Sequence, residues 1–273
     1  MAREPRAVTE QLLEAAIAPL RRVIVAYSGG VDSAVVLAAA SRALGEDVLA
    51  VTASSASVAQ GEVESAASLA RAIGVAHEII ETREFDDPRY RANAADRCYY
   101  CKSELYSALS LLASQRGYEA VLDGTNADDG KATLDLRPGH AAARQFGVRS
   151  PLAELGIGKQ EVRAIAARYG LHVADKPATP CLSSRVPHGT RIEIDDLRRI
   201  DLAERYLRAS GFSTVRVRHF GATARVEVPL EDIERMRDIK ERAGRAFAAV
   251  GYENIDIDER GYRTGSLNEE LRP

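Results

Sequence analysis

The sequence predicts an α/β protein in which a doubly wound parallel sheet is followed by a smaller α+β domain. The first observation is a series of short apolar runs, each followed by a helix-like stretch, up to about residue 125. Continuous apolar strands between amphipathic helices are typical of a parallel sheet that is covered on both faces. The second observation is a change of pattern after residue 190, where alternating strands lie between two long helices. We expect the first domain to span residues 1–185 and the second 186–273.

The elements of the first domain follow from this alternation, because each strand is a short apolar run and each helix repeats apolar residues at helical spacing. The strands are expected at VIVAYS, DVLAVTAS, HEIIE and AVLDGT. The helices are expected near residues 31–44, 62–73, 102–116 and 158–169. The weakly periodic stretch from Ala127 to Pro151 predicts a long loop with a short helix.

The second domain is predicted from two helical stretches and three short strands. Its elements, in order, are a helix over 195–210, strands at TVRVRHF and ARVEVP, a helix over 230–250 and a strand at NIDIDE. We expect these strands to form a small antiparallel sheet. The segment before this domain contains three prolines between residues 177 and 187, which predicts an irregular loop.

Composition narrows the class of protein. The chain has 273 residues, of which 45% are hydrophobic and 28% charged, as expected of a globular protein. The apolar runs are too short to span a bilayer, and the first twenty residues lack the apolar core of a signal peptide. The net charge of -3 supplies no general attraction to nucleic acid. Three cysteines do not make a disulfide framework, so we expect a cytoplasmic protein.

A glycine turn lies between the first predicted strand and the first long helix. Backbone N–H groups of such a turn, with the positive end of the helix dipole, favour a bound phosphate. The Walker A pattern needs a lysine and a Ser or Thr after the second glycine, but Val31, Asp32 and Ser33 follow here. The sequence thus argues against an ordinary P-loop kinase or GTPase. A turn that merely joins strand to helix is the alternative interpretation.

The residues SGGVDS resemble the PP-loop of ATP pyrophosphatases, which cleave ATP between its α and β phosphates. The resemblance implies that the turn holds pyrophosphate and that Asp32 holds Mg²⁺ against it. The carboxyl ends of neighbouring parallel strands are expected to meet beside this turn. The residues expected to bind ATP are Ser28, Gly29, Gly30, Asp32, Ser33, Thr52, Gly124 and Asn126.

The cysteines have a spacing that suggests metal or redox chemistry. Cys98 and Cys101 form a CxxC pair just before a predicted helix, and Cys181 lies in the irregular loop. Thiolates at a helix N-terminus are stabilised as anions, and this spacing lets both sulfurs face one metal. A redox couple, a zinc site and an iron–sulfur site all fit. Zinc would need a fourth ligand such as His188, whereas a 4Fe–4S cluster held by three cysteines leaves one iron open.

Later motifs carry a more specific resemblance. They are RCYYCKSELY, GTNADD, PCLSSRVPHGTRI, RVRHFG, ARVEV and YRTGSLNEE. Together with SGGVDS they resemble the LarE family of ATP-dependent sulfur transferases over almost the full chain. The resemblance implies that pyridinium-3,5-biscarboxylic acid mononucleotide is adenylylated and its carboxylates become thiocarboxylates. This is a step toward the nickel-pincer nucleotide of lactate racemase.

The resemblance also assigns roles to the cysteines. Cys181 matches the cysteine that in some members donates its own sulfur and becomes dehydroalanine, but those members lack the CxxC pair. This chain resembles the subgroup in which three cysteines bind a 4Fe–4S cluster that carries the donated sulfide. We favour the cluster at Cys98, Cys101 and Cys181 over a sacrificial Cys181 and over structural zinc, because a sulfide on iron can be replaced after each turnover.

Substrate-binding residues are predicted in the second domain and the loop before it. Arg216 and Arg218 alternate with valines, so both guanidiniums leave one face of a strand and suit a phosphate or carboxylate. A solvated strand face is the alternative. The resemblance gives Arg216 and Arg218 the substrate role, and adds Arg185, Glu227 and Arg263 as candidates. For Glu227, a cross-strand ion pair is an equal alternative.

Two rival functions remain at this point. A tRNA thiolase also combines a PP-loop with a CxxC pair and a distant cysteine, but the negative net charge and 5% aromatic content argue against RNA binding. A non-catalytic nucleotide-binding protein with structural zinc is the second. For the favoured function we expect ATP, Mg²⁺ and a 4Fe–4S cluster as cofactors, a small-molecule nucleotide as substrate, and a homo-oligomer, with a hexamer implied by the resemblance.

Overall fold

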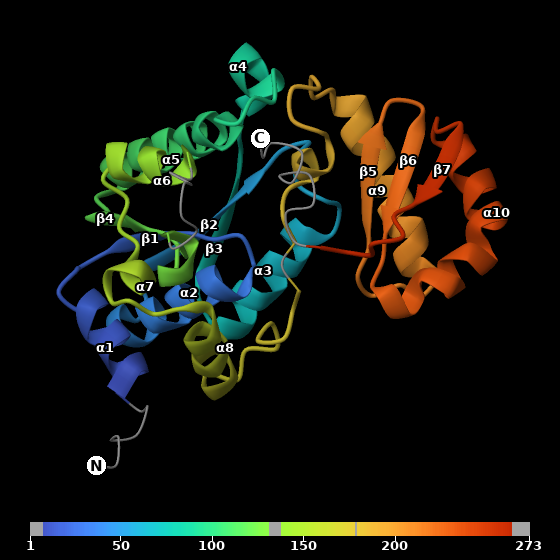
Figure 1. Ribbon diagram of the computed structural model, residues 1–273. Coiled ribbons are helices and arrows are strands. Elements are labelled where there is room, and N and C mark those ends of the chain that lie inside the picture. Colours follow the sequence, from blue (N-terminus) through green and yellow to red (C-terminus); the bar gives the residue numbers. More distant parts are fainter. Residues whose placement is uncertain (1–7, 131–137, 178, 264–273) are drawn as a thin grey trace. The chain divides into compact units, whose positions relative to one another are not determined.

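The computed structural model describes residues 8–130, 138–177 and 179–263, and its backbone divides into two compact units (Figure 1). Unit 1 is drawn from Met1–Ser55, Gly61–Asp86 and Cys98–Thr179. Unit 2 is drawn from Ala56–Gln60, Asp87–Arg97 and Pro180–Pro273. The domain boundary expected at residues 185 and 186 stays a prediction. Most of the motif YRTGSLNEE, from residue 264 onward, lies outside the described residues.

Unit 1 contains a four-stranded sheet in the order β3-β2-β1-β4, and every neighbouring pair is parallel. The strands are β1 (Val23–Ala26), β2 (Val48–Ser54), β3 (Ala76–Glu81) and β4 (Ala120–Leu122). Val23 of β1 stands opposite Val48 on one side and Ala120 on the other. The strand order reverses between β1 and β4, and ligands of such sheets bind at this switch point.

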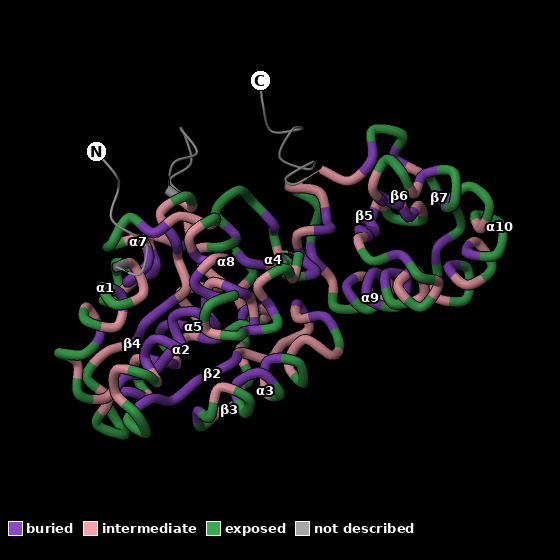
Figure 2. The backbone as a smooth tube through the Cα atoms, turned by 90° about the horizontal axis from the view of Figure 1, so that it is seen from below, coloured by how far each residue is buried: buried purple, intermediate pink, exposed green. Residues whose placement is uncertain are grey.

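Helices cover both faces of this sheet. Those described in unit 1 are α1 (Val8–Ile17), α2 (Val31–Leu44), α3 (Glu62–Ile73), α5 (Arg97–Arg116), α6 (Pro138–Gln145), α7 (Pro151–Glu154) and α8 (Lys159–Arg168). Val23 and Val25 pack with α1, α2, α3 and α8, whereas Ile24 packs with α5 and α6 on the opposite face. Figure 2 shows β2 buried along most of its length. The predicted doubly wound parallel sheet is therefore confirmed.

The longest helix of unit 1 begins earlier than predicted. The spacing placed its start at residue 102, but α5 begins at Arg97, so Cys98 lies in its first turn and Cys101 at the start of its second, and neither lies before the helix. Cysteine and tyrosine have modest helix propensities, which is why RCYYC gave no helical signal. No helix in the described part of the chain is both long and apolar enough to cross a membrane.

Unit 2 is built around a three-stranded sheet in the order β5-β6-β7. Its elements are α4 (Pro88–Arg91), η3 (Leu182–Arg185), α9 (Ile194–Ala209), β5 (Arg216–Phe220), β6 (Thr223–Glu227), η4 (Leu230–Asp232), α10 (Ile233–Ala249) and β7 (Asn254–Ile257). β5 and β6 are antiparallel, but β7 runs parallel to β6. The expected all-antiparallel sheet was wrong for β7, because α10 crosses over and returns the chain to the end of the sheet where β6 began.

The end of β4 lies directly against the first turn of α2. A Cβ on Gly124 would lie only 2.6 Å from the backbone nitrogen of Ser33. Real Cβ atoms do not approach backbone this closely, so this position accepts glycine alone. The close approach brings the segment after β4 to the N-terminus of α2.

Gly124→Ala is expected to lower the free energy of unfolding by about 1–3 kcal/mol, because backbone at Ser33 cannot move aside as a side chain would. Urea unfolding measures the change. Gly244→Ala is the matched control: it lies within α10, where an added Cβ would meet no described atom within 4 Å. Alanine should raise the stability there by up to about 1 kcal/mol. Equal stability of Gly124→Ala and the parent would contradict the close approach.

Candidate functional site

Two serines shape the glycine turn after β1. The Ser33 hydroxyl donates to the carbonyl oxygen of Gly30 at 3.1 Å and accepts from the Ser28 N–H at 3.2 Å. Gly29 has a φ of +72°, and a Cβ there would lie 2.9 Å from that of Ala66. Gly30 is the N-cap of α2 and has no side chain to accept the first N–H groups of the helix. The turn therefore presents backbone donors and hydroxyls suited to a phosphate.

Polar side chains from β2 and from the segment after β4 lie near this turn. The Asn126 side-chain amide donates to Asp32 Oδ1 at 3.1 Å. Thr52, in β2, donates its hydroxyl to the Tyr27 carbonyl oxygen at 2.7 Å and lies 2.8 Å from His77 Nε2. Asn126 thus reaches the helix turn, while the Thr52 hydroxyl fixes the end of β1.

Asp32 has an ionic partner that the sequence analysis missed. Lys159 Nζ lies 2.5 Å from Asp32 Oδ2. Lys159 is the first residue of α8, and 127 positions separate it from Asp32. From the sequence, Lys159 would be predicted to be an ordinary surface lysine at the start of a helix. No local pattern therefore indicated that it pairs with Asp32.

A buried carboxylate lies beside the same strand end. Asp123 accepts hydrogen bonds from the Tyr106 and Ser150 hydroxyls, each at 2.7 Å, and from the Thr125 N–H at 3.0 Å. Burial would raise the pKa of Asp123, but the charge of Lys102 and these hydrogen bonds outweigh it and hold the pKa below its usual value. The ionised Asp123 therefore ties α5 and Ser150 to the segment that carries Asn126.

The cysteines are accessible. Cys98 is exposed and Cys101 partly exposed, and their three-residue spacing on α5 places them on one side of the helix. Cys181 is exposed and directly precedes η3 in unit 2. Within residues 8–130, 138–177 and 179–263, no three His, Cys, Asp or Glu side chains are gathered into a metal site. The CxxC pair belongs to unit 1 and Cys181 to unit 2.

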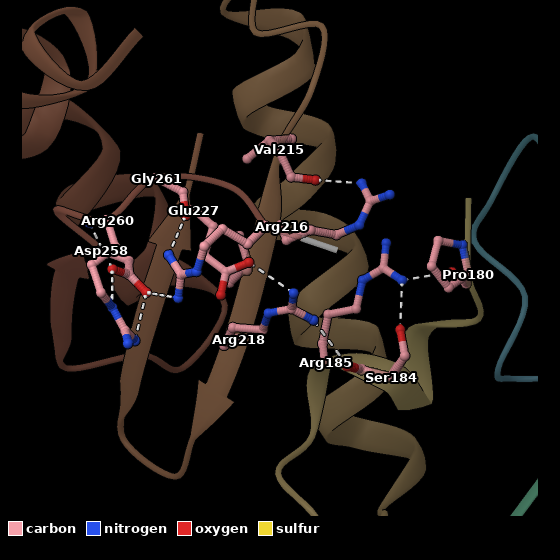
Figure 3. Close-up of polar contacts among 12 residues, drawn as sticks. Pro180, Ser184, Arg185, Val215, Arg216, Arg218, Glu227, Asp258, Arg260 and Gly261 are labelled. Carbon is pink, nitrogen blue, oxygen red and sulfur yellow. Dashed lines mark hydrogen bonds and ion pairs between the residues drawn. The ribbon is translucent and has the colours of Figure 1, made fainter. Parts of the chain in front are cut away.

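Arg185 is fully buried in unit 2 and paired with Glu204. Figure 3 shows Arg185 beside Pro180 and Ser184. Its guanidinium meets Glu204 through two bonds of 2.9 and 3.1 Å. Burial raises the pKa of Glu204, but Arg185 and neighbouring arginines outweigh it and hold the pKa below its usual value. Arg185 Nη1 also donates to the carbonyl oxygens of Pro180 and Cys181, at 2.5 and 3.0 Å. This arginine therefore anchors the loop that carries Cys181.

Arg216 and Arg218 are buried in unit 2, so the solvated strand face was the wrong alternative. Arg218 donates to Glu227 at 2.7 Å and to the Ser184 carbonyl oxygen at 3.0 Å. The cross-strand ion pair considered for Glu227 is therefore present. Burial, together with the charge of Arg185, lowers the pKa of Arg216 from its usual value.

Figure 3 shows Arg185, Arg216 and Arg218 close to one another, and we call them the arginine cluster. Arg263 donates to the Gly261 carbonyl oxygen at 2.9 Å and lies 3.6 Å from Asp258. The structure thus places the Arg218–Glu227 pair beside Arg185 and Arg216.

Arg185→Met is expected to lower the free energy of unfolding by about 3–5 kcal/mol, because Glu204 would stay buried without its main partner. The double variant Arg185→Met with Glu204→Met should regain much of this loss, since neither side chain of the pair is then left buried without the other. Urea unfolding of all forms provides the measurement.

The control for this pair is Arg191→Met, which removes an exposed ion pair with Glu193. We expect a change below about 1 kcal/mol. If Arg185→Met were as stable as Arg191→Met, Arg185 would not be the anchor described here.

Comparison with known proteins places these features in a family. A family model described as queuosine biosynthesis protein QueC matches residues 22–97, which include β1, the glycine turn and β2. An uncharacterized protein of Synechocystis sp. is 46% identical over 254 residues, covering 92% of this chain and 94% of that protein.

Two relatives have functional names. The pyridinium-3,5-bisthiocarboxylic acid mononucleotide synthase of Lactiplantibacillus plantarum is 38% identical over 266 residues, covering 97% of this chain and 95% of that protein. The tRNA-specific 2-thiouridylase MnmA of Xanthobacter autotrophicus is 29% identical over 224 residues, covering 67% of this chain but 56% of that protein. Similarity to the synthase therefore extends through both units.

Proposed function

This chain belongs to the LarE family of ATP-dependent sulfur transferases, and we propose that it adenylylates pyridinium-3,5-biscarboxylic acid mononucleotide and converts its carboxylates to thiocarboxylates. The observation that carries the choice of substrate is the 38% identity, over almost the full length of both chains, to the L. plantarum synthase. The thiocarboxylate product would then serve nickel-pincer nucleotide synthesis.

In the activation step, ATP lies on the turn from Ser28 to Ser33, with Thr52, Gly124 and Asn126 around it. A substrate carboxylate oxygen attacks the α-phosphorus, the bond to pyrophosphate breaks, and a carboxyl adenylate forms. Negative charge accumulates on pyrophosphate as its bond breaks, so the fixed donors of the turn lower the barrier. The Asp32 carboxylate already attracts a cation, the Lys159 ammonium, which supports it as the Mg²⁺ ligand. Mg²⁺ bound there neutralises phosphate charge.

We assign the substrate to the arginine cluster, with Glu227 and Arg263 as further contacts. Guanidiniums outnumber the buried carboxylates Glu204 and Glu227 in this cluster. The pKa of Arg216 is lowered, because burial and the neighbouring positive charge of Arg185 disfavour its charged form. A phosphate or carboxylate of the substrate would add negative charge beside these guanidiniums.

For the sulfur step, we propose that Cys98, Cys101 and Cys181 hold a 4Fe–4S cluster. Accessible thiols at the start of a helix fit this group, since thiolates are its ligands and the helix N-terminus stabilises them. When bound by three cysteines, a cluster has one open iron that can carry sulfide. Sulfide supplied by such a cluster would displace AMP from the carboxyl carbon, which would give the thiocarboxylate. Donation of the Cys181 sulfur itself is the alternative.

We place this enzyme in the cytoplasm, as a homo-oligomer with a hexamer as the expected assembly. Three exposed or partly exposed cysteines support a reducing compartment. A tRNA thiolase remains the second candidate, because the chain is similar to MnmA. That similarity covers little more than half of MnmA, and the net charge of -3 supplies no general attraction to RNA.

Asp32→Ala is expected to slow pyrophosphate release at least about hundredfold while the protein stays folded, because the leaving group loses its metal ligand. Pyrophosphate is measured with ATP, Mg²⁺ and the pyridinium substrate, and circular dichroism checks the fold. Asp47→Ala is the control, since Asp47 is a half-exposed carboxylate paired with Arg22. A folded Asp32→Ala variant with normal pyrophosphate release would refute the role of Asp32.

Protein reconstituted without oxygen is expected to show a broad absorption band at roughly 400 nm, with about four irons per chain. Cys98→Ala should lose both the band and the sulfur transfer. Mass spectrometry of the variant after one turnover tests whether Cys181 has donated its own sulfur instead. If Cys98→Ala still transferred sulfur once and Cys181 lost the mass of hydrogen sulfide, the sacrificial route would replace the cluster.

A further inference from the structure

We propose that Lys159 is an exchangeable counter-ion for Asp32. It neutralises Asp32 in the structure described above, and its ammonium moves to the phosphates of ATP when Mg²⁺ binds Asp32. The inference rests on the proposed function and deepens it, because it adds a residue from α8 to the activation step.

Both oxygens of Asp32 have partners. Oδ2 meets Lys159 Nζ at 2.5 Å, and Oδ1 accepts from the Asn126 amide at 3.1 Å. The Lys159 side chain is 36% exposed and that of Asp32 23%, so a ligand from solvent can reach the pair. Mg²⁺ binds carboxylate oxygens at about 2.1 Å. A metal at that distance and an ammonium on the same carboxylate would repel each other, so the binding of Mg²⁺ favours release of Lys159.

The backbone of Lys159 is held while its ammonium can move. The Lys159 N–H donates to Asp128 Oδ2 at 2.7 Å, and the Asp128 N–H donates to Asn126 Oδ1 at 2.9 Å. Since Asn126 also bonds Asp32, these contacts close a ring from Asp32 back to the start of α8. The ring fixes the base of the lysine, and four flexible carbons leave the charged end free to choose a new partner.

The phosphates are the partner within reach. Asp32 lies in the first turn of α2, one residue before Ser33, and the ammonium is already at this turn. Helices α2 and α8 share one hydrophobic core, so their N-termini keep this relation. ATP brings negative charge to the same turn, and pyrophosphate gains more as its bond breaks. A flexible point charge such as lysine suits that developing charge.

The test separates metal binding from chemistry. Lys159→Met should bind Mn²⁺ severalfold more tightly without nucleotide, measured by electron paramagnetic resonance of free Mn²⁺, because the competing ammonium is gone. The same variant should release pyrophosphate about hundredfold more slowly, because the leaving group loses a cation. Lys159→Gln, which is also uncharged, should show both effects, and Lys159→Arg should keep Mn²⁺ affinity near that of the parent.

Arg168→Met is the matched control, since Arg168 ends the same helix and its ion pair with Glu10 is similarly exposed, at 37% and 21%. Arg168→Met should change neither the Mn²⁺ affinity nor the rate of pyrophosphate release. Unchanged or weaker Mn²⁺ binding by both uncharged variants overturns the exchange, as does pyrophosphate release at the parent rate. The Mn²⁺ measurement needs no organic substrate. If the parent protein released no pyrophosphate with the pyridinium substrate, the proposed function would fail, while the competition for Asp32 would still be decided.

Discussion

The close approach of β4 to the first turn of α2 sets the geometry of the nucleotide site. Glycine at position 124 removes the side chain that would separate the two elements. Because the strand end lies there, Asn126 reaches Asp32, and Asp128 reaches the start of α8. The switch point of the sheet therefore brings together the end of β4 and the first turns of α2 and α8, through the close approach at Gly124 and the side chains of Asn126 and Asp128.

Buried charges hold the loops that carry the candidate site residues in both units. An ionised carboxylate such as Asp123 is costly to bury unless donors surround it, and here four hydrogen bonds and the charge of Lys102 stabilise it. The Arg185–Glu204 pair in unit 2 has the same character, and it holds the backbone next to Cys181. Buried pairs of this kind contribute little net stability, but they fix conformation. Asp123 thus holds the segment that carries Asn126, and Arg185 holds the loop that carries Cys181.

The sequence predicted the doubly wound sheet and the glycine turn because both are local patterns: apolar runs, helical spacing and paired glycines. It failed where long-range contacts decide. The direction of β7 depends on how α10 packs, and the burial of Arg185 depends on Glu204, which lies on a different element. The Asp32–Lys159 pair joins residues 127 positions apart. The pattern within a single segment does not show which distant residue a charged side chain will pair with. A charged residue of this kind is therefore predicted to lie on the surface.

The origin of the cation distinguishes this nucleotide site from a Walker A loop. In Walker A sequences the phosphate-binding lysine follows the glycines within the same turn. Here Asp32 follows the glycines, and the lysine comes from a separate helix. In the proposed function, this carboxylate would hold Mg²⁺ against the pyrophosphate that leaves, which suits cleavage between the α and β phosphates. Because the cation and the carboxylate belong to different elements, they can form a pair or separate, and in the proposed exchange the arrival of Mg²⁺ with ATP would provide the charge that separates them.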